Sequence, residues 1–245
     1  MQQPGTRARS VAIVAALLAC VHAQAAIEVR VLAEPADISP LPQISLGVLV
    51  GAPGPIAGKL GCRFMSGADN SLVIVAPSGK RLTLTPGRSS FEFDGLHYPL
   101  PAPAVTAGDQ VICALRPVLE ALGATVHWNA QAQKLDVGTR VDAIDVFGDE
   151  DAVRVRITTP LRCRGTLGHL ADPERYYVDL PGTAVALEHE QTLVNCAEVL
   201  RVRWGQFKSD PPVTRIVADL SAKRQMRWVP AEDGLGGSLI LGEPD

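Results

Sequence analysis

Aromatic residues are scarce in this 245-residue chain, at 4% of the composition, so the sequence predicts no broad platform for stacking sugars or bases. Its net charge of −3 lacks the basic excess typical of nucleic-acid-binding proteins, and we expect no nucleic-acid partner. The sequence also lacks the H-E-x-x-H zinc helix, the G-x-S-x-G nucleophile turn, and the glycine-rich phosphate and dinucleotide loops. These absences predict a non-catalytic protein with no metal centre and no cofactor.

The N-terminus has the layout of an export signal. Arg7 and Arg9 precede an apolar run, residues 11–21, which is too short to span a bilayer, and Ala23-Gln24-Ala25 follows as a small-residue cleavage pattern. We therefore expect residues 1–25 to be removed and the protein to reach the periplasm or the cell wall. The segment 17–20 offers an alternative, because it resembles a lipobox that would leave a lipoprotein anchored at Cys20.

Four cysteines remain after such a signal: Cys62, Cys113, Cys163 and Cys196. An even number of cysteines in an oxidising compartment favours disulfides, and the simplest pairs are Cys62 with Cys113 and Cys163 with Cys196. Buried free thiols are the alternative, and the sequence does not decide between the two.

A partial internal repeat organises the first half of the mature chain. Residues 49–75 align without gaps over residues 111–137, pairing for example Gly61 with Gly123. In the better-preserved copy, the apolar residues at 115, 118, 119 and 122 follow helical spacing, and Gly123 stands where a helix would end. Each copy therefore predicts a strand, a short helix and a hairpin.

Short strands separated by glycine and proline turns fill the rest of the chain. Between the two copies we expect a meander over the ranges 71–76, 81–84, 90–93 and 96–100. From residue 141 onward, strands without a convincing helix favour a β-sandwich. The prediction is a mainly β protein, with an α+β domain over 27–138 and a β-sandwich domain over 142–245.

Paired arginines are the strongest candidates for a binding site. Arg154 and Arg156 alternate with apolar residues on one expected strand, and Arg201 and Arg203 do so on another. We expect residues 153, 155, 157, 200, 202 and 204 to face the interior, which would send these arginines outward. On adjacent strands they would form a basic stripe for carboxylate or phosphate groups, with Arg215 as a fifth candidate. The alternative is a solvated sandwich face.

Other polar residues carry weaker signals. Glu188-His189-Glu190 is the one cluster that could attract a metal, but adjacent side chains on a strand point to opposite sides, so we expect a solvated loop. Asp179 and Asp219 each stand near the end of an apolar strand. We expect each to bond backbone or an arginine, such as Arg215 for Asp219, rather than to act as an acid–base pair.

The stretch 113–137 carries the first family resemblance. The run Cys-Ala-Leu-Arg-Pro-Val-Leu-Glu-Ala-Leu-Gly-Ala-Thr-Val-His-Trp-Asn, residues 113–129, with Lys-Leu-Asp-Val at 134–137, is similar to the copper amine oxidase N-terminal domain-like, or stalk, module of bacterial surface proteins. The family pattern begins with Pro-Leu-Arg, where this chain has Ala-Leu-Arg. The resemblance implies a stalk that holds no copper and no catalytic cofactor.

The stretch 141–242 resembles the AMIN domain, the β-sandwich that accompanies N-acetylmuramoyl-L-alanine amidases and pilus secretins. The similarity rests on Tyr-Val-Asp-Leu-Pro-Gly at 177–182, Val-Arg-Trp-Gly-Gln-Phe at 202–207 and Thr-Arg-Ile-Val-Ala-Asp-Leu at 214–220. It implies a module that binds peptidoglycan. No zinc hydrolase domain follows in these residues, so we carry over no zinc ligand and no catalytic glutamate.

Together these observations predict a non-catalytic envelope protein that contacts peptidoglycan or another wall polymer through its second half. The alternative is a structural adaptor that assembles with an envelope protein, such as an amidase or a secretin, without binding glycan.

Overall fold

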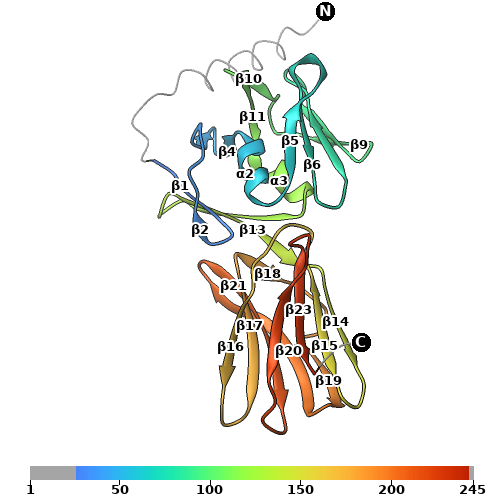
Figure 1. Cartoon of the computed structure of the whole chain (residues 1–245). Coiled ribbons are helices and arrows are strands. Elements are labelled where there is room, and N and C mark those ends of the chain that lie inside the picture. Colours follow the sequence, from blue (N-terminus) through green and yellow to red (C-terminus); the bar gives the residue numbers. More distant parts are fainter. Residues whose placement is uncertain (1–25, 243–245) are drawn as a thin grey trace, which may run out of the picture. The chain divides into compact units, whose positions relative to one another are not determined.

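The computed structural model describes residues 26–242, so the predicted export signal and Cys20 lie outside the described residues. The described chain folds as two compact units. The first contains residues 26–29, 35–122 and 128–135, and the second contains residues 30–34, 123–127 and 136–242. The protein is mainly β, as the sequence predicts (Figure 1). Within residues 26–242, no helix is long and apolar enough to cross a membrane.

Each copy of the predicted repeat forms a strand, a short helix and a hairpin. The first copy contains β4 (Val48–Gly51), α2 (Pro53–Lys59), β5 (Arg63–Ser66), the short η1 (Ala68–Asn70) and β6 (Leu72–Val75). The second contains β11 (Gln110–Ala114), α3 (Leu115–Ala121), β12 (Ala124–Asn129) and β13 (Lys134–Val141). Gly123 follows α3 with a φ of 97°, the left-handed conformation that its position in the sequence predicts.

The predicted meander is also present. The strands β5, β6, β7 (Arg81–Leu84), β8 (Ser90–Phe93) and β9 (Leu96–Pro99) pair in chain order. A second sheet has the order β10-β11-β4-β3, with β10 at Val105–Ala107 and β3 at Gln43–Ser45. A third has the order β12-β13-β1-β2, with β1 at Glu28–Val31, β2 at Glu34–Pro35, and β18 (Thr183–Val185) running parallel to β13.

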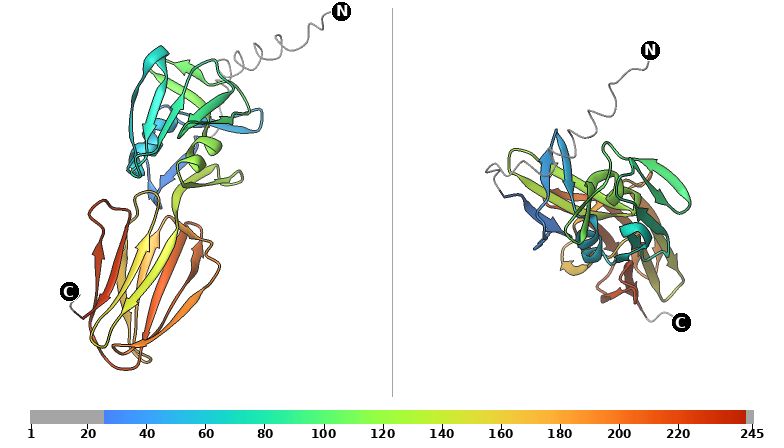
Figure 2. Two further views of the ribbon diagram at one scale, coloured as in Figure 1. Left: turned by 90° about the vertical axis from the view of Figure 1, so that its right-hand side faces the viewer. Right: turned by 90° about the horizontal axis from the view of Figure 1, so that it is seen from above.

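The second unit is a sandwich of two antiparallel sheets (Figure 2). The four-stranded sheet has the order β14 (Ala143–Gly148), β15 (Val153–Thr158), β23 (Gly236–Leu241) and β22 (Met226–Pro230). The five-stranded sheet has the order β16 (Thr166–Leu170), β17 (Arg175–Pro181), β21 (Pro212–Leu220), β20 (Val199–Ser209) and β19 (Gln191–Cys196). Apolar residues from both sheets form one buried cluster between them.

Five of the six residues predicted to face this interior do so. Val153, Val155, Ile157 and Val202 are buried, and Trp204 is partly buried against the same cluster. Leu200 is the exception, at 44% exposed. A β-bulge shifts the register of β20 between Val199 and Arg201, so Val199 enters the core in place of Leu200.

Candidate ligand-binding face

The five candidate arginines lie on two different sheets. Arg154 and Arg156 belong to β15 of the four-stranded sheet, whereas Arg201, Arg203 and Arg215 belong to β20 and β21 of the five-stranded sheet. Side chains that point outward from the two sheets of a sandwich leave it on opposite sides. The two pairs therefore cannot form one basic stripe, and that prediction is wrong. Strand alternation predicts whether a side chain is outward, but not which sheet carries it.

On the four-stranded sheet, the arginines differ in their surroundings. Arg156 donates to Asp145 on the adjacent strand β14 at 3.0 Å, and its guanidinium lies 5.0 Å from the centre of the Phe147 ring. Arg154 forms no ion pair with any of the described residues. With Phe147, both arginines line a shallow hollow of about 460 Å³. One of the two positive charges on β15 is thus already compensated.

Asp219 organises the first arginine cluster on the outer face of the five-stranded sheet. Arg201 donates from Nε to its Oδ2 at 2.6 Å, and Arg203 donates from Nε and Nη2 to its two oxygens at 3.0 and 3.2 Å. Arg175 stands directly opposite Asp219 in the pairing of β17 with β21. Burial raises the pKa of Asp219, but the hydrogen bonds and charges of Arg203 and Arg201 outweigh it, so the pKa lies below its ordinary value.

Arg215 is the centre of a second, stacked cluster on the same face. It donates to both oxygens of Asp179 at 2.6 and 2.8 Å, and these bonds raise its own pKa. Its guanidinium lies 3.5 Å from the ring centre of Phe207 and 4.1 Å from that of Tyr177. Asp179 therefore bonds an arginine as predicted, but the suggested pair of Arg215 with Asp219 is wrong. Arg215 donates to Asp179 on the neighbouring strand β17, whereas Asp219 accepts hydrogen bonds from two arginines of β20.

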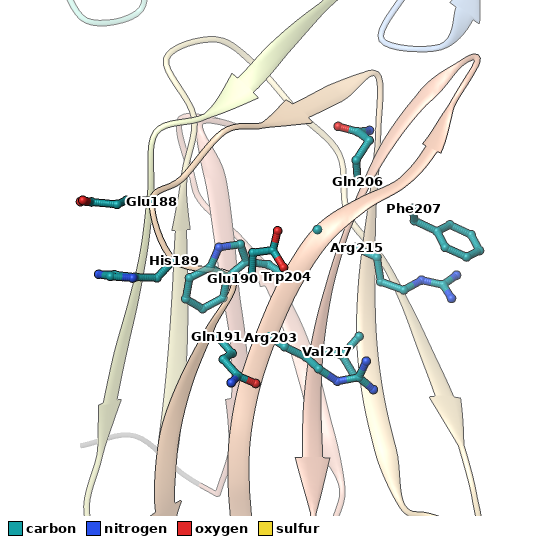
Figure 3. A pocket seen from close by; sticks show the side chains of 11 residues that line it. Glu188, His189, Glu190, Gln191, Arg203, Trp204, Gln206, Phe207, Arg215 and Val217 are labelled. Atoms are coloured by element: carbon teal, nitrogen blue, oxygen red, sulfur yellow. The ribbon is translucent and has the colours of Figure 1, made fainter.

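Two hollows lie along the outer face of the five-stranded sheet. The larger, of about 830 Å³, lies where β20 continues beyond the end of β19. Arg203, Arg215 and Phe207 extend to one side of β20, and Glu188 and His189 extend to the other (Figure 3). The smaller, of about 390 Å³, surrounds Asp219 and is lined by all three arginines of the first cluster and by exposed leucines. Sequence reasoning missed Arg175 and Phe207 as site residues, although Phe207 ends one of the runs that carry the family resemblance and Arg175 lies two residues before another.

The structure gives no metal ligand set. No group of three or more histidine, cysteine, aspartate or glutamate side chains within residues 26–242 could hold a metal ion. Glu188, His189 and Glu190 are exposed on the loop before β19, which is the predicted position. His169 lies 2.7 Å from Glu174 at the far end of the β16–β17 hairpin.

The four cysteines of the described chain are free thiols, and no disulfide joins them. Cys62, Cys113 and Cys163 are buried, and Cys196 is partly buried. Burial raises the pKa of Cys62 to about 11 and that of Cys113 to about 12. Of the two alternatives that the sequence leaves open, the structure has the buried thiols.

Comparison with known families supports this description of the fold. Residues 37–137 match the family model of the copper amine oxidase N-terminal domain. Residues 131–235 match the AMIN domain. The two matches have the order that the sequence predicts, and the second unit is called the AMIN-like unit below. A search of curated proteins found no significant match.

The AMIN match places the arginine clusters in context. AMIN domains are associated with peptidoglycan and with targeting to the bacterial envelope, and both matching families are non-catalytic accessory domains. The match ends at residue 235, just before β23, although β23 lies between β15 and β22 and completes the four-stranded sheet. The outer face of the five-stranded sheet of the AMIN-like unit, with both clusters, lies inside the matched range.

Proposed function

We propose that this chain is a non-catalytic envelope protein whose AMIN-like unit binds peptidoglycan through the outer face of its five-stranded sheet. The observation that carries the proposal is the cluster at Asp219. Three arginines, Arg175, Arg201 and Arg203, line the hollow around this carboxylate, and Glu174 lines it as a second carboxylate. The three positive charges still exceed the two negative charges there, in a concave site open to solvent.

The free donors of this cluster suit an anionic wall group. Each guanidinium has five N–H donors, and Arg201 uses only Nε toward Asp219. Asp219 fixes Arg201 and Arg203 in place, so less side-chain entropy is lost when a ligand carboxylate or phosphate arrives. Each new charge-assisted hydrogen bond contributes about 1.5–3 kcal/mol, and less where water competes.

Arg215 has a different role in this proposal. Its guanidinium already donates to both oxygens of Asp179, and the Phe207 and Tyr177 rings lie close to it. It is therefore a positioning residue that holds the Phe207 ring, which is 47% exposed, beside the larger hollow. The exposed ring offers an apolar contact to a ligand bound there.

A protein partner in the envelope is the second candidate, and one observation favours it. Leu170, Leu193 and Leu200 are 43%, 70% and 44% exposed. The register places Leu170 and Leu193 in the same outward row as Arg201, and Leu200 lines the smaller hollow. Exposed leucines around charged groups are typical of a protein contact surface.

Co-sedimentation of the purified chain with isolated sacculi tests the proposal. We expect binding at low salt that weakens between about 0.1 M and about 1 M salt, as screening of exposed charges shortens from about 10 Å to about 3 Å. No muropeptides should be released into the supernatant. Absence of binding at low salt would reject the proposal and favour the protein partner, and released muropeptides would indicate an enzyme.

A further inference from the structure

The larger hollow lies at a free strand edge in the AMIN-like unit. β19 pairs with β20 only up to Arg203. In the last backbone hydrogen bond, the Trp204 N–H donates to the Glu190 carbonyl at 2.9 Å. Farther along β20, the Gln206 side chain donates to the Thr183 carbonyl at 3.2 Å. Between these two points the chain leaves the edge of β20, and the hollow of about 830 Å³ is lined by side chains from both faces of the strand.

Charges of opposite sign line the two sides of this hollow. Glu188 and Glu190 are exposed, and neither forms an ion pair with a described residue. Across the edge of β20 lies Arg203, which shares one carboxylate with Arg201 and keeps donors free (Figure 3). Two uncompensated carboxylates and the partly compensated guanidinium of Arg203 therefore border one hollow.

Neutral groups between the charges add hydrogen-bonding capacity. The indole N–H of Trp204 is buried and has no hydrogen-bond partner among the described residues. Gln191 and Gln206 contribute amide side chains, and Phe207 contributes an exposed ring. This combination of charges, amides and an aromatic ring fits a short peptide better than an uncharged sugar, which would leave the charges unpaired. A polyphosphate fits less well because the two unpaired glutamates would repel it.

We infer that this hollow is a subsite for a peptide that carries both a free ammonium group and a carboxylate. Glu190, whose carboxylate points toward β20 (Figure 3), binds the ammonium group, Glu188 adds negative charge on the same side of the hollow, and Arg203 binds the carboxylate. The inference rests on the proposed function, because it assigns recognition at this face to the peptide part of the wall rather than to its glycan. In this assignment, Glu188 and Glu190 determine the specificity of the subsite.

Sacculi with acetylated amino groups provide the test. Acetylation removes the ammonium charge and leaves glycan and carboxylates unchanged, so the parent chain should bind acetylated sacculi about fivefold to tenfold more weakly than untreated sacculi. The variant Glu188→Gln/Glu190→Gln should bind untreated sacculi with a similar loss, and acetylation should not weaken it further. Its thermal melt should match that of the parent, because neither glutamate forms an ion pair with a described residue.

Glu150→Gln/Glu232→Gln is the matched control, since it removes the same charge from two exposed positions that do not line the hollow. It should bind like the parent and stay sensitive to acetylation. If the parent binds both kinds of sacculi equally well, the peptide subsite is wrong while the proposed function stands. If the parent binds neither kind, the proposed function fails and the subsite fails with it.

Discussion

Asp219 connects stability and binding at the scale of a single residue. Its side chain is only 12% exposed, and two arginines from β20 hold it. Because its folded-state pKa lies below the ordinary value of about 3.9, its ionised form stabilises the fold above that pH, and this contribution is lost as the pH falls through the folded-state pKa. The same carboxylate orients the guanidinium groups that we assign to the ligand.

Replacing Asp219 with Asn should lower the free energy of unfolding by about 1–2 kcal/mol at pH 7, since two partly exposed arginines lose their charged acceptor. The difference should shrink as the pH falls through the lowered pKa of Asp219, because the parent residue then becomes protonated. Urea unfolding at a series of pH values from 7 downward measures both effects. Asp145→Asn is the control; its partner Arg156 is 56% exposed, so we expect a loss of no more than about 0.5–1 kcal/mol. Equal losses would show that burial does not distinguish the two pairs.

The cysteines give a second test at this scale. The raised pKa values of Cys62 and Cys113, about 11 and about 12, keep both thiols protonated and unreactive at pH 8. Alkylation of the folded chain, followed by peptide mass analysis, should label the partly buried Cys196 first. In denaturant without reductant, all four of these cysteines should react. Protection of Cys62 and Cys113 in denaturant would instead indicate the disulfide.

At the scale of elements, the bulge in β20 decides which side chains reach the core. Regular alternation would bury Leu200, whereas the bulge buries Val199 at 1% exposure and leaves Leu200 at 44%. Val199→Ala should therefore cost about 1.5–3 kcal/mol of unfolding free energy, and Leu200→Ala no more than about 0.5 kcal/mol. Chemical denaturation of the two variants measures this. The reverse order would mean that the strand runs without the bulge.

The bulge also illustrates what the sequence can and cannot predict. Local features were predictable: the helix α3, the left-handed Gly123 and the alternation of Val153, Val155 and Ile157 all follow from neighbouring residues. Each strand pairs with strands that are distant in the sequence, so the residues around Arg154 and Arg201 could not predict that the two arginines lie on different sheets. The site was predicted as arginines alone, because the contribution of Phe207 arises only when the fold stacks it on Arg215.

At the scale of the whole molecule, the core of the AMIN-like unit lies almost entirely within one stretch of sequence. Of the buried residues in its cluster, only Val141 precedes Val153. We therefore expect a fragment of residues 142–245 to melt cooperatively. A fragment of residues 136–245 should be more stable by about 1–2 kcal/mol, because it keeps Val141 and the pairing of β13 with β18. Calorimetry of both fragments tests this, and a non-cooperative melt of the longer one would mean that it depends on the rest of the chain.

We propose that one face of the AMIN-like unit binds the wall, and a comparison of variants on its two sheets tests this. The variant Arg201→Gln/Arg203→Gln/Asp219→Asn removes the cluster of the five-stranded sheet without leaving a buried carboxylate unpaired. The variant Arg154→Gln/Arg156→Gln/Asp145→Asn makes the same charge change on the four-stranded sheet. The measurement is the affinity of each variant for sacculi at low salt. We predict a loss of at least about tenfold for the first variant and less than about twofold for the second, since only in the first does one carboxylate hold both arginines in place for a ligand. Equal affinity of both variants and the parent would contradict the claim.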